Sequence, residues 1–179
     1  YDYKQVYKWL HFLDKFDPKS NILPSAAAYY YAKTQRPSDV TYLLDYLEER
    51  SFADPEYNWW WLSQSIYLAN SVLGDKQRAI KIAGVLRKVQ ADVPIWARQM
   101  EAFLREDLGE KDQAANIMCD AIKNSKNFKN LPQREIDFFV YFFKERLKIW
   151  KGKENELIEY CAKREMGLTT NSDAPKAAQ

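Results

Sequence analysis

The side chains that most often carry chemistry are scarce in this chain. One His, His11, and two Cys, Cys119 and Cys161, occur among 179 residues. A metal site or a nucleophile–base pair needs several such groups close together, and no Cys-x-x-Cys pair and no second His is present. We therefore expect His11 to be structural. We expect both cysteines to be buried free thiols that pack as small apolar side chains, since a disulfide between them would require adjacent helices in good register.

Paired carboxylates do not supply the missing chemistry. Glu48-Glu49 and Glu106-Asp107 are immediate neighbours in the sequence. Successive residues of a helix point about 100° apart, so neither pair converges as a general acid and base. We predict no catalytic residue, no bound metal and no cofactor, and hence a protein that is not an enzyme.

Charge and composition narrow the class of protein further. The chain carries 27 basic and 25 acidic residues, a net charge of +2, which is too balanced for a dedicated nucleic-acid binder. Residues 123–179 hold 12 basic and 8 acidic groups, which fits either a solvated helix surface or contact with an acidic partner or a phospholipid surface. Aromatic residues make up 15% of the chain against only five glycines, which predicts a folded core built from helices.

The hydrophobic pattern has the period of helices throughout. Val6, Trp9, Leu10 and Leu13 recur at i, i+3, i+4 and i+7, and no stretch alternates as a strand does. Proline, glycine and capping residues divide the chain into nine expected helices, over residues 6–16, 26–33, 40–47, 54–73, 79–89, 95–108, 114–122, 132–150 and 157–164. We predict an all-α protein, with residues 168–179 as a disordered tail.

A repeat of 35 residues organises these helices. Shifting the chain by 35 places apolar residues on apolar residues and turn on turn, in the pairs Trp61/Trp96, Leu68/Phe103, Leu73/Leu108, Gly74/Gly109, Ala79/Ala114 and Ile82/Ile117. The period-matched aromatics Trp61, Trp96 and Phe103 are therefore interpreted as structural. Because one helical hairpin cannot bury its apolar face alone, such units must stack.

This unit resembles the tetratricopeptide repeat, two antiparallel helices of about 34 residues. Gly109, Ala114, Met118 and Ala121 stand where that family has its turn and its second helix, and Leu73-Gly74-Asp75 begins a similar stretch. The resemblance implies one domain over residues 1–167, a short right-handed α-solenoid of about four antiparallel hairpins. Its units would be residues 1–18 (partial), 22–53, 56–91, 94–124 and 132–166, so the first helix would be the second helix of a unit that begins upstream. Sel1-like and HEAT-like hairpins are the alternatives.

The resemblance also implies where a partner binds, because first helices line the concave surface of such arrays. The triplets Tyr29-Tyr30-Tyr31 and Trp59-Trp60-Trp61 stand on first helices, and three neighbours on a helix cannot all face one core. They are either buried between adjacent repeats or partly exposed as binding anchors. Our candidates for the groove lining are Tyr30, Trp60, Gln64, Arg98 and Gln99.

A second candidate surface lies on the expected eighth helix. It is apolar over more than one face and carries a basic flank that includes Lys144, Arg146 and Lys148. An aromatic-rich terminal helix is either a cap folded back on the array or a docking surface. For the docking alternative we single out Phe139, Phe143 and Lys148.

Together these features predict a non-catalytic scaffold that binds a peptide, a helix or a subunit within a larger assembly. No run of 18 apolar residues occurs, so no transmembrane segment is expected. The chain begins at Tyr1 rather than Met, from which we expect a removed upstream segment. The alternative function is therefore an accessory subunit of a membrane-bound complex, with its anchor or signal peptide upstream. Localisation stays open between the cytoplasm and a membrane-associated or periplasmic site.

Overall fold

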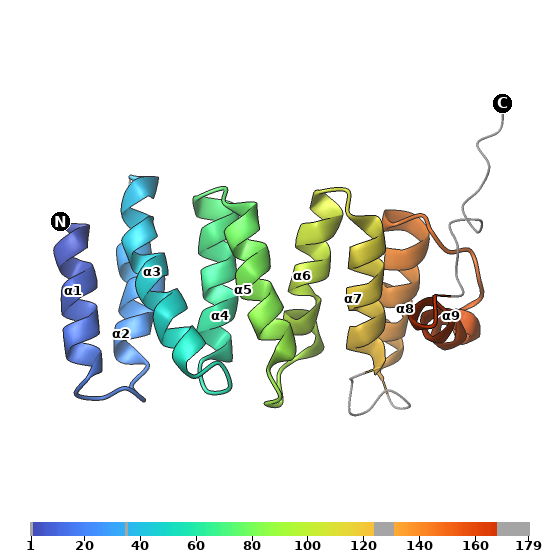
Figure 1. Ribbon diagram of the computed structural model, residues 1–179, viewed down its shortest axis with the longest axis horizontal. Coiled ribbons are helices and arrows are strands. Elements are labelled where there is room, and N and C mark those ends of the chain that lie inside the picture. Colours follow the sequence, from blue (N-terminus) through green and yellow to red (C-terminus); the bar gives the residue numbers. More distant parts are fainter. Residues whose placement is uncertain (1, 35, 124–130, 168–179) are drawn as a thin grey trace. The chain divides into compact units, whose positions relative to one another are not determined.

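The structure, a computed structural model, describes residues 2–34, 36–123 and 131–167. Over these residues it contains helices, turns and loops and no strand, which confirms the all-α prediction (Figure 1). The polar stretch at 124–130 and the tail predicted to be disordered at 168–179 lie outside the described residues.

Contacts divide the chain into two compact units. Unit 1 covers Tyr1–Glu101 and unit 2 covers Ala102–Gln179. The border falls inside one helix, α6 (Ile95–Asp107), and thus inside the expected repeat unit at 94–124. Each unit is described by itself below.

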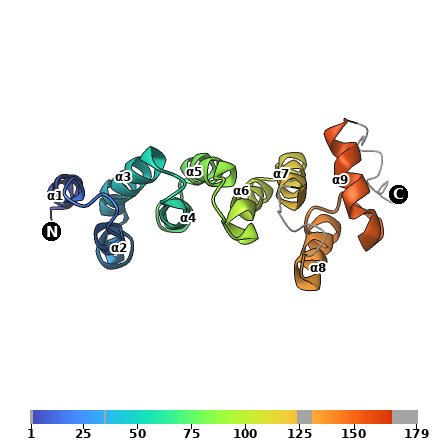
Figure 2. The same ribbon diagram turned by 90° about the horizontal axis from the view of Figure 1, so that it is seen from below.

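Unit 1 is built from antiparallel helices in two rows. Its elements are α1 (Tyr3–Asp14), α2 (Ile22–Ser25) with η1 (Ala26–Tyr30) and η2 (Tyr31–Lys33), α3 (Pro37–Ala53), α4 (Trp59–Tyr67) with η3 (Leu68–Val72), α5 (Lys76–Lys88) and the first half of α6. Seen along the helices, α2 and α4 form one row and α1, α3 and α5 the other (Figure 2). Helix α3 packs against α1, η1 and α4, and α4 packs against α5, so the core lies between the rows.

Local sequence explains where these helices begin and turn. The Asp2 carboxylate accepts the N–H groups of Lys4 and Gln5, and the Asp75 carboxylate accepts that of Arg78, so both aspartates are N-caps. Pro37 is the first residue of α3, where its missing N–H costs nothing. Gly74 turns the chain between η3 and α5 at φ +68°, a left-handed conformation that favours glycine.

Four expected boundaries in the two units are wrong by four residues or more. The third helix ends at Ala53 rather than at residue 47. The second helix begins at Ile22 rather than at residue 26, with Pro24 accommodated in its first turn. The fourth begins at Trp59, because Asp54-Pro55-Glu56 forms the turn that follows α3. The eighth ends at Arg146 rather than at Trp150.

Unit 2 comprises the second half of α6, α7 (Lys111–Lys123), α8 (Gln133–Tyr141) with η5 (Phe142–Arg146), η6 (Glu154–Glu156) and α9 (Leu157–Glu165). Gly109 turns the chain between α6 and α7 at φ +78°. The core contains the fully buried side chains Met118, Ile122, Phe139, Phe142 and Phe143. The aromatic face of α8 is therefore used inside unit 2.

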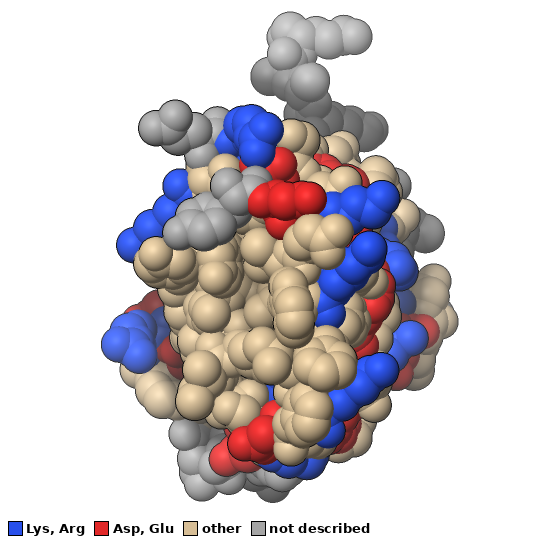
Figure 3. Space-filling view, turned by 90° about the vertical axis from the view of Figure 1, so that its left-hand side faces the viewer, with Lys and Arg blue, Asp and Glu red and all other residues tan. Residues whose placement is uncertain are grey.

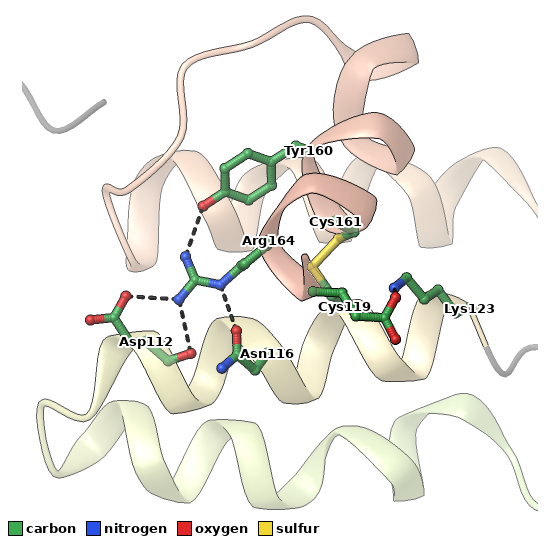
Figure 4. The surroundings of a disulfide bond; sticks show 8 residues. Asp112, Asn116, Cys119, Lys123, Tyr160, Cys161 and Arg164 are labelled. Carbon is green, nitrogen blue, oxygen red and sulfur yellow. Dashed lines mark hydrogen bonds and ion pairs between the residues drawn. A yellow bond between two sulfur atoms is a disulfide. The ribbon is translucent and has the colours of Figure 1, made fainter. Parts of the chain in front are cut away.

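A disulfide joins α7 to α9, which overturns the expectation of two free thiols. The Sγ atoms of Cys119 and Cys161 are 2.03 Å apart and their Cα atoms 5.3 Å apart. The two helices pack directly on one another, so the side chains meet in the register that a disulfide requires (Figure 4). Arg164 adds polar links one turn further along α9, donating to Asn116 Oδ1 (2.7 Å) and to the carboxylate of Asp112 (2.7 Å) on α7.

Candidate interaction surface

Partly exposed aromatic rings in contact with one another connect three elements of unit 1, η1, α4 and α6. The Trp60 indole N–H on α4 donates to the Tyr29 hydroxyl on η1 across 2.9 Å. The ring of Trp60 lies 5.8 Å from that of Trp59 and 6.3 Å from that of Trp96 on α6. We call these four residues, Tyr29, Trp59, Trp60 and Trp96, together with Tyr30, the exposed neighbour of Tyr29 whose ring contacts Tyr31, the aromatic strip.

The aromatic strip is accessible to a partner. Tyr30 is 65% exposed, and Tyr29, Trp60 and Trp96 are between 41% and 44% exposed. These rings meet mostly edge to face, for example at 88° between Trp59 and Trp60. This arrangement is favourable between aromatic rings and holds the exposed side chains in place.

Each aromatic triplet is divided between core and surface, as its helical spacing requires. Trp61 is only 5% exposed, and its indole N–H donates to Asn21 Oδ1 across 2.9 Å. Trp60, its neighbour, turns outward. Tyr31 is half-buried, and its carbonyl accepts the Tyr3 hydroxyl, whereas Tyr30 faces solvent. The candidates Tyr30 and Trp60 are thus both exposed to solvent.

The structure corrects one expectation at the end of the aromatic strip and adds one residue near it. Trp96 was expected to be structural like Trp61, 35 residues earlier, but it is 42% exposed. Tyr67 stands seven residues after Trp60 on the same helical face and is 57% exposed, and no triplet marks it in the sequence. The candidate Gln64 lies between them on α4 and is half-buried.

Two other groove candidates, Arg98 and Gln99, differ in their burial. The Arg98 guanidinium donates to the backbone carbonyls of Arg87, Val89 and Ala91 at 2.7–3.2 Å, closing the C-terminal end of α5 and the loop after it. Gln99 is 3% exposed, and its buried Nε2 has no hydrogen-bond acceptor among the described residues. Gln99 is too deeply buried to line an open groove, so its assignment is corrected, whereas Arg98 is half-buried and stays a candidate.

Of the three candidates in unit 2, two are buried and one is exposed. Phe139 is 1% exposed and Phe143 fully buried, with the Phe143 ring 5.7 Å from that of Tyr160 on α9. A partner cannot contact these two rings while unit 2 is folded, so their assignment to a docking surface is wrong. Lys148 is exposed, in a left-handed conformation at φ 56°.

His11 takes part in a polar link between α1 and α3. Its Nε2 lies 3.1 Å from the carboxylate of Glu49, which also accepts the Tyr7 hydroxyl at 2.9 Å. Partial burial and this hydrogen bond to Glu49 raise the pKa of Tyr7, so its hydroxyl remains protonated and a donor. The adjacent Glu48 points to Arg78 and Lys81 on α5 instead, so the two neighbouring carboxylates diverge.

The described part of the chain offers little else that could hold a ligand. It contains no cluster of three or more His, Cys, Asp or Glu side chains suited to a metal ion. In the described part of unit 2, a mainly apolar pocket of about 550 Å³ is lined by side chains that include Ile122, Ile136, Phe139 and Leu157. Among the described helices none has the length and apolar character needed to span a membrane.

Comparison of the chain with protein-family models, with curated proteins and with solved structures found no match.

Proposed function

We propose that this chain is a non-catalytic protein-interaction module made of stacked helical hairpins of the tetratricopeptide type. It binds a peptide, a helix or a subunit along the aromatic strip of unit 1. The single observation that carries this proposal is the set of partly exposed Tyr and Trp rings contributed by η1, α4 and α6.

The physical chemistry of these side chains favours protein binding. Tyr and Trp offer large apolar faces together with a polar group, and they dominate the energetics of many interfaces. Rings already held by their neighbours lose little conformational freedom on binding. The Trp60–Tyr29 hydrogen bond and the edge-to-face packing hold the aromatic strip in this way.

Affinity capture with unit-1 variants tests this function. The full chain and its Trp60→Ala and Tyr30→Ala variants are used as bait in native extract, and bound proteins are quantified by mass spectrometry. We expect at least a tenfold loss of a specific partner in either variant. Tyr141→Ala is the matched control, because Tyr141 is 53% exposed but lies on α8 in unit 2. Retention of all partners by both unit-1 variants would contradict the proposal.

The disulfide favours a second candidate, an accessory subunit of a membrane-bound assembly in an oxidising compartment. Cys119 and Cys161 are the only cysteines, and they are bonded to each other. Disulfides persist in the periplasm, the secretory pathway and extracellular space and are rare in the cytosol. Alkylation of free thiols at the moment of lysis tests this candidate: protected cysteines support it, and two alkylated cysteines in native cells contradict it.

A further inference from the structure

Helix α1 presents an exposed apolar face to solvent at one end of unit 1. Trp9 is 60% exposed, Phe12 49%, Leu13 43% and Phe16 74%. The rings form a continuous row, with centroids 5.8 Å apart for Trp9–Phe12 and 5.3 Å apart for Phe12–Phe16. Figure 3 shows this end of the molecule as a broad uncharged surface with charged groups at its margin. We call these four residues the α1 face.

The α1 face is not required by the core of unit 1. Helix α1 packs on α3 with its opposite side, where Tyr3 and Leu10 are buried. Tyr46 of α3 donates to Asp14 of α1, and Arg50 of α3 pairs with the same carboxylate. Solvation of four large apolar side chains is unfavourable, and a contiguous exposed patch of this kind marks an interaction site.

A row of unpaired lysines runs along one edge of the α1 face. Lys4, Lys8 and Lys15 are exposed and stand at i, i+4 and i+11, which places them in one stripe about 110° around the helix from the apolar residues. None of the three forms an ion pair with a described residue, whereas Lys19, Lys81 and Arg78 of the same unit all do. These lysines are therefore free to pair with carboxylates of a molecule that covers the α1 face.

The charge pattern favours a helix over a lipid surface. Positive charge borders the apolar face along one edge only, and the exposed carboxylates of Asp2 and Asp17 lie near its two ends. An anionic membrane would be repelled by these carboxylates. A partner with carboxylates along a single edge meets the lysines and avoids both aspartates.

The arrangement of unit 1 shows how such a helix would lie. Helix α3 packs against η1, the continuation of α2, and α5 packs against α4, so each has an antiparallel helix before it. No described residue occupies the corresponding position on α1. We propose that the α1 face docks an amphipathic helix of a partner protein, about three turns long, with an apolar stripe and a row of Asp or Glu facing Lys4, Lys8 and Lys15. This second surface is separate from the aromatic strip and goes beyond the proposed function.

Site-specific photo-cross-linking identifies the occupant. A benzophenone side chain is introduced at Phe12 of the full chain, cross-linked in native extract and mapped by mass spectrometry. We expect the attached segment to be an amphipathic helix with acidic residues along one edge. The corresponding synthetic peptide should bind the wild-type chain in fluorescence anisotropy.

Charge-reversal variants then test the lysine edge. The triple variant K4E/K8E/K15E should bind the peptide at least tenfold more weakly, since three ion pairs are replaced by repulsion. The control K33E/K76E/K88E changes the net charge of unit 1 by the same amount at lysines away from α1 and should stay within threefold. Circular dichroism confirms that each variant is folded, and K8E alone replaces the triple variant if that one is not.

Four results would overturn this inference. They are a cross-link from Phe12 to another segment of the same protein or to a second copy of it, an attached segment without an acidic edge, equal loss of affinity in the two triple variants, and the absence of any protein cross-link. Co-sedimentation with vesicles of 30% phosphatidylserine and 70% phosphatidylcholine that requires Trp9 would assign the α1 face to a membrane instead. The Trp60→Ala variant is tested separately. If it loses a partner, that result concerns the aromatic strip and not the α1 face.

Discussion

The indole N–H of Trp60 on α4 donates to the hydroxyl of Tyr29 on η1, with 2.9 Å between nitrogen and oxygen. This hydrogen bond crosses from one hairpin of unit 1 to the next, 31 residues apart in the sequence. It connects two anchors of the aromatic strip while leaving more than 40% of each side chain exposed. The surface of the aromatic strip therefore depends on packing between hairpins.

A double-mutant cycle measures this connection. Tyr29→Phe and Trp60→Phe each remove one partner of the hydrogen bond and keep an aromatic ring. Because both groups reach water, we expect each single variant to lose less than about 1 kcal/mol of unfolding free energy. The double variant should recover a coupling energy of about 0.5–1 kcal/mol in urea denaturation. Strictly additive losses would show that the hydrogen bond contributes nothing in solution.

Removal of the disulfide should destabilise unit 2 selectively. The bond closes a loop between residues 42 apart, and cross-links of this length contribute about 2–4 kcal/mol. In C119S/C161S we expect faster hydrogen exchange in α7 and α9, with exchange in α3 and α5 of unit 1 unchanged. The wild-type chain in excess reductant should reproduce the variant. Equal exchange in oxidised and reduced protein would contradict this prediction.

Arg50 is expected to be the most sensitive charged residue of unit 1. Its side chain is 4% exposed, pairs with Asp14, and donates to the carbonyls of Pro18 (2.7 Å) and Ser20 (2.9 Å). Arg50→Met leaves the partly buried Asp14 carboxylate with only the Tyr46 hydroxyl as a partner and removes the donor to two carbonyls, which should cost about 3–5 kcal/mol. Protection of α1 amides from hydrogen exchange is the measurement.

The control for Arg50 is another arginine of the same unit. Arg36 lies 2.9 Å from Asp39, but its side chain is 69% exposed, so Arg36→Met should cost less than about 1 kcal/mol. Similar losses in the two variants would refute the importance of burial for the Arg50 pair.

Glu48 should make the stability of unit 1 depend on pH in the acid range. Burial alone would raise its pKa, but hydrogen bonds from Lys81 and Arg78 outweigh burial and hold the pKa below its ordinary value of 4.5. A carboxylate with a lowered pKa stabilises the fold above the pKa of the unfolded chain, and this contribution is lost as the pH falls through the folded-state pKa. We expect Glu48→Gln to be less stable than wild type by about 1–2 kcal/mol at pH 7.

The pH dependence of the stability difference shows whether the charge of Glu48 or only its packing stabilises unit 1. The difference in unfolding free energy between wild type and Glu48→Gln should shrink steadily below pH 4.5, because wild-type Glu48 then becomes neutral as well. Urea denaturation at a series of pH values gives this difference. A difference that does not vary between pH 7 and pH 3 would assign the loss to packing alone.

The sequence by itself determined the class of fold and most helix boundaries, because these depend on local physics. Apolar residues at helical spacing, the N-cap Asp75 and the turn residues Gly74 and Gly109 act over a few neighbours and are readable in one dimension. The same spacing predicted that neither aromatic triplet would face a single core, which is why Tyr30 and Trp60 were recognised as candidates.

Only the tertiary structure decided which of these side chains are accessible. Burial depends on what packs against a helix from elsewhere in the chain, so Trp61 and Trp96 differ although they stand at equivalent repeat positions. For the same reason Phe139, Phe143 and Gln99 are buried, although the sequence pattern had suggested them for binding surfaces. The disulfide needed two helices 42 residues apart to lie in register, a relation between Cys119 and Cys161 that no local pattern encodes.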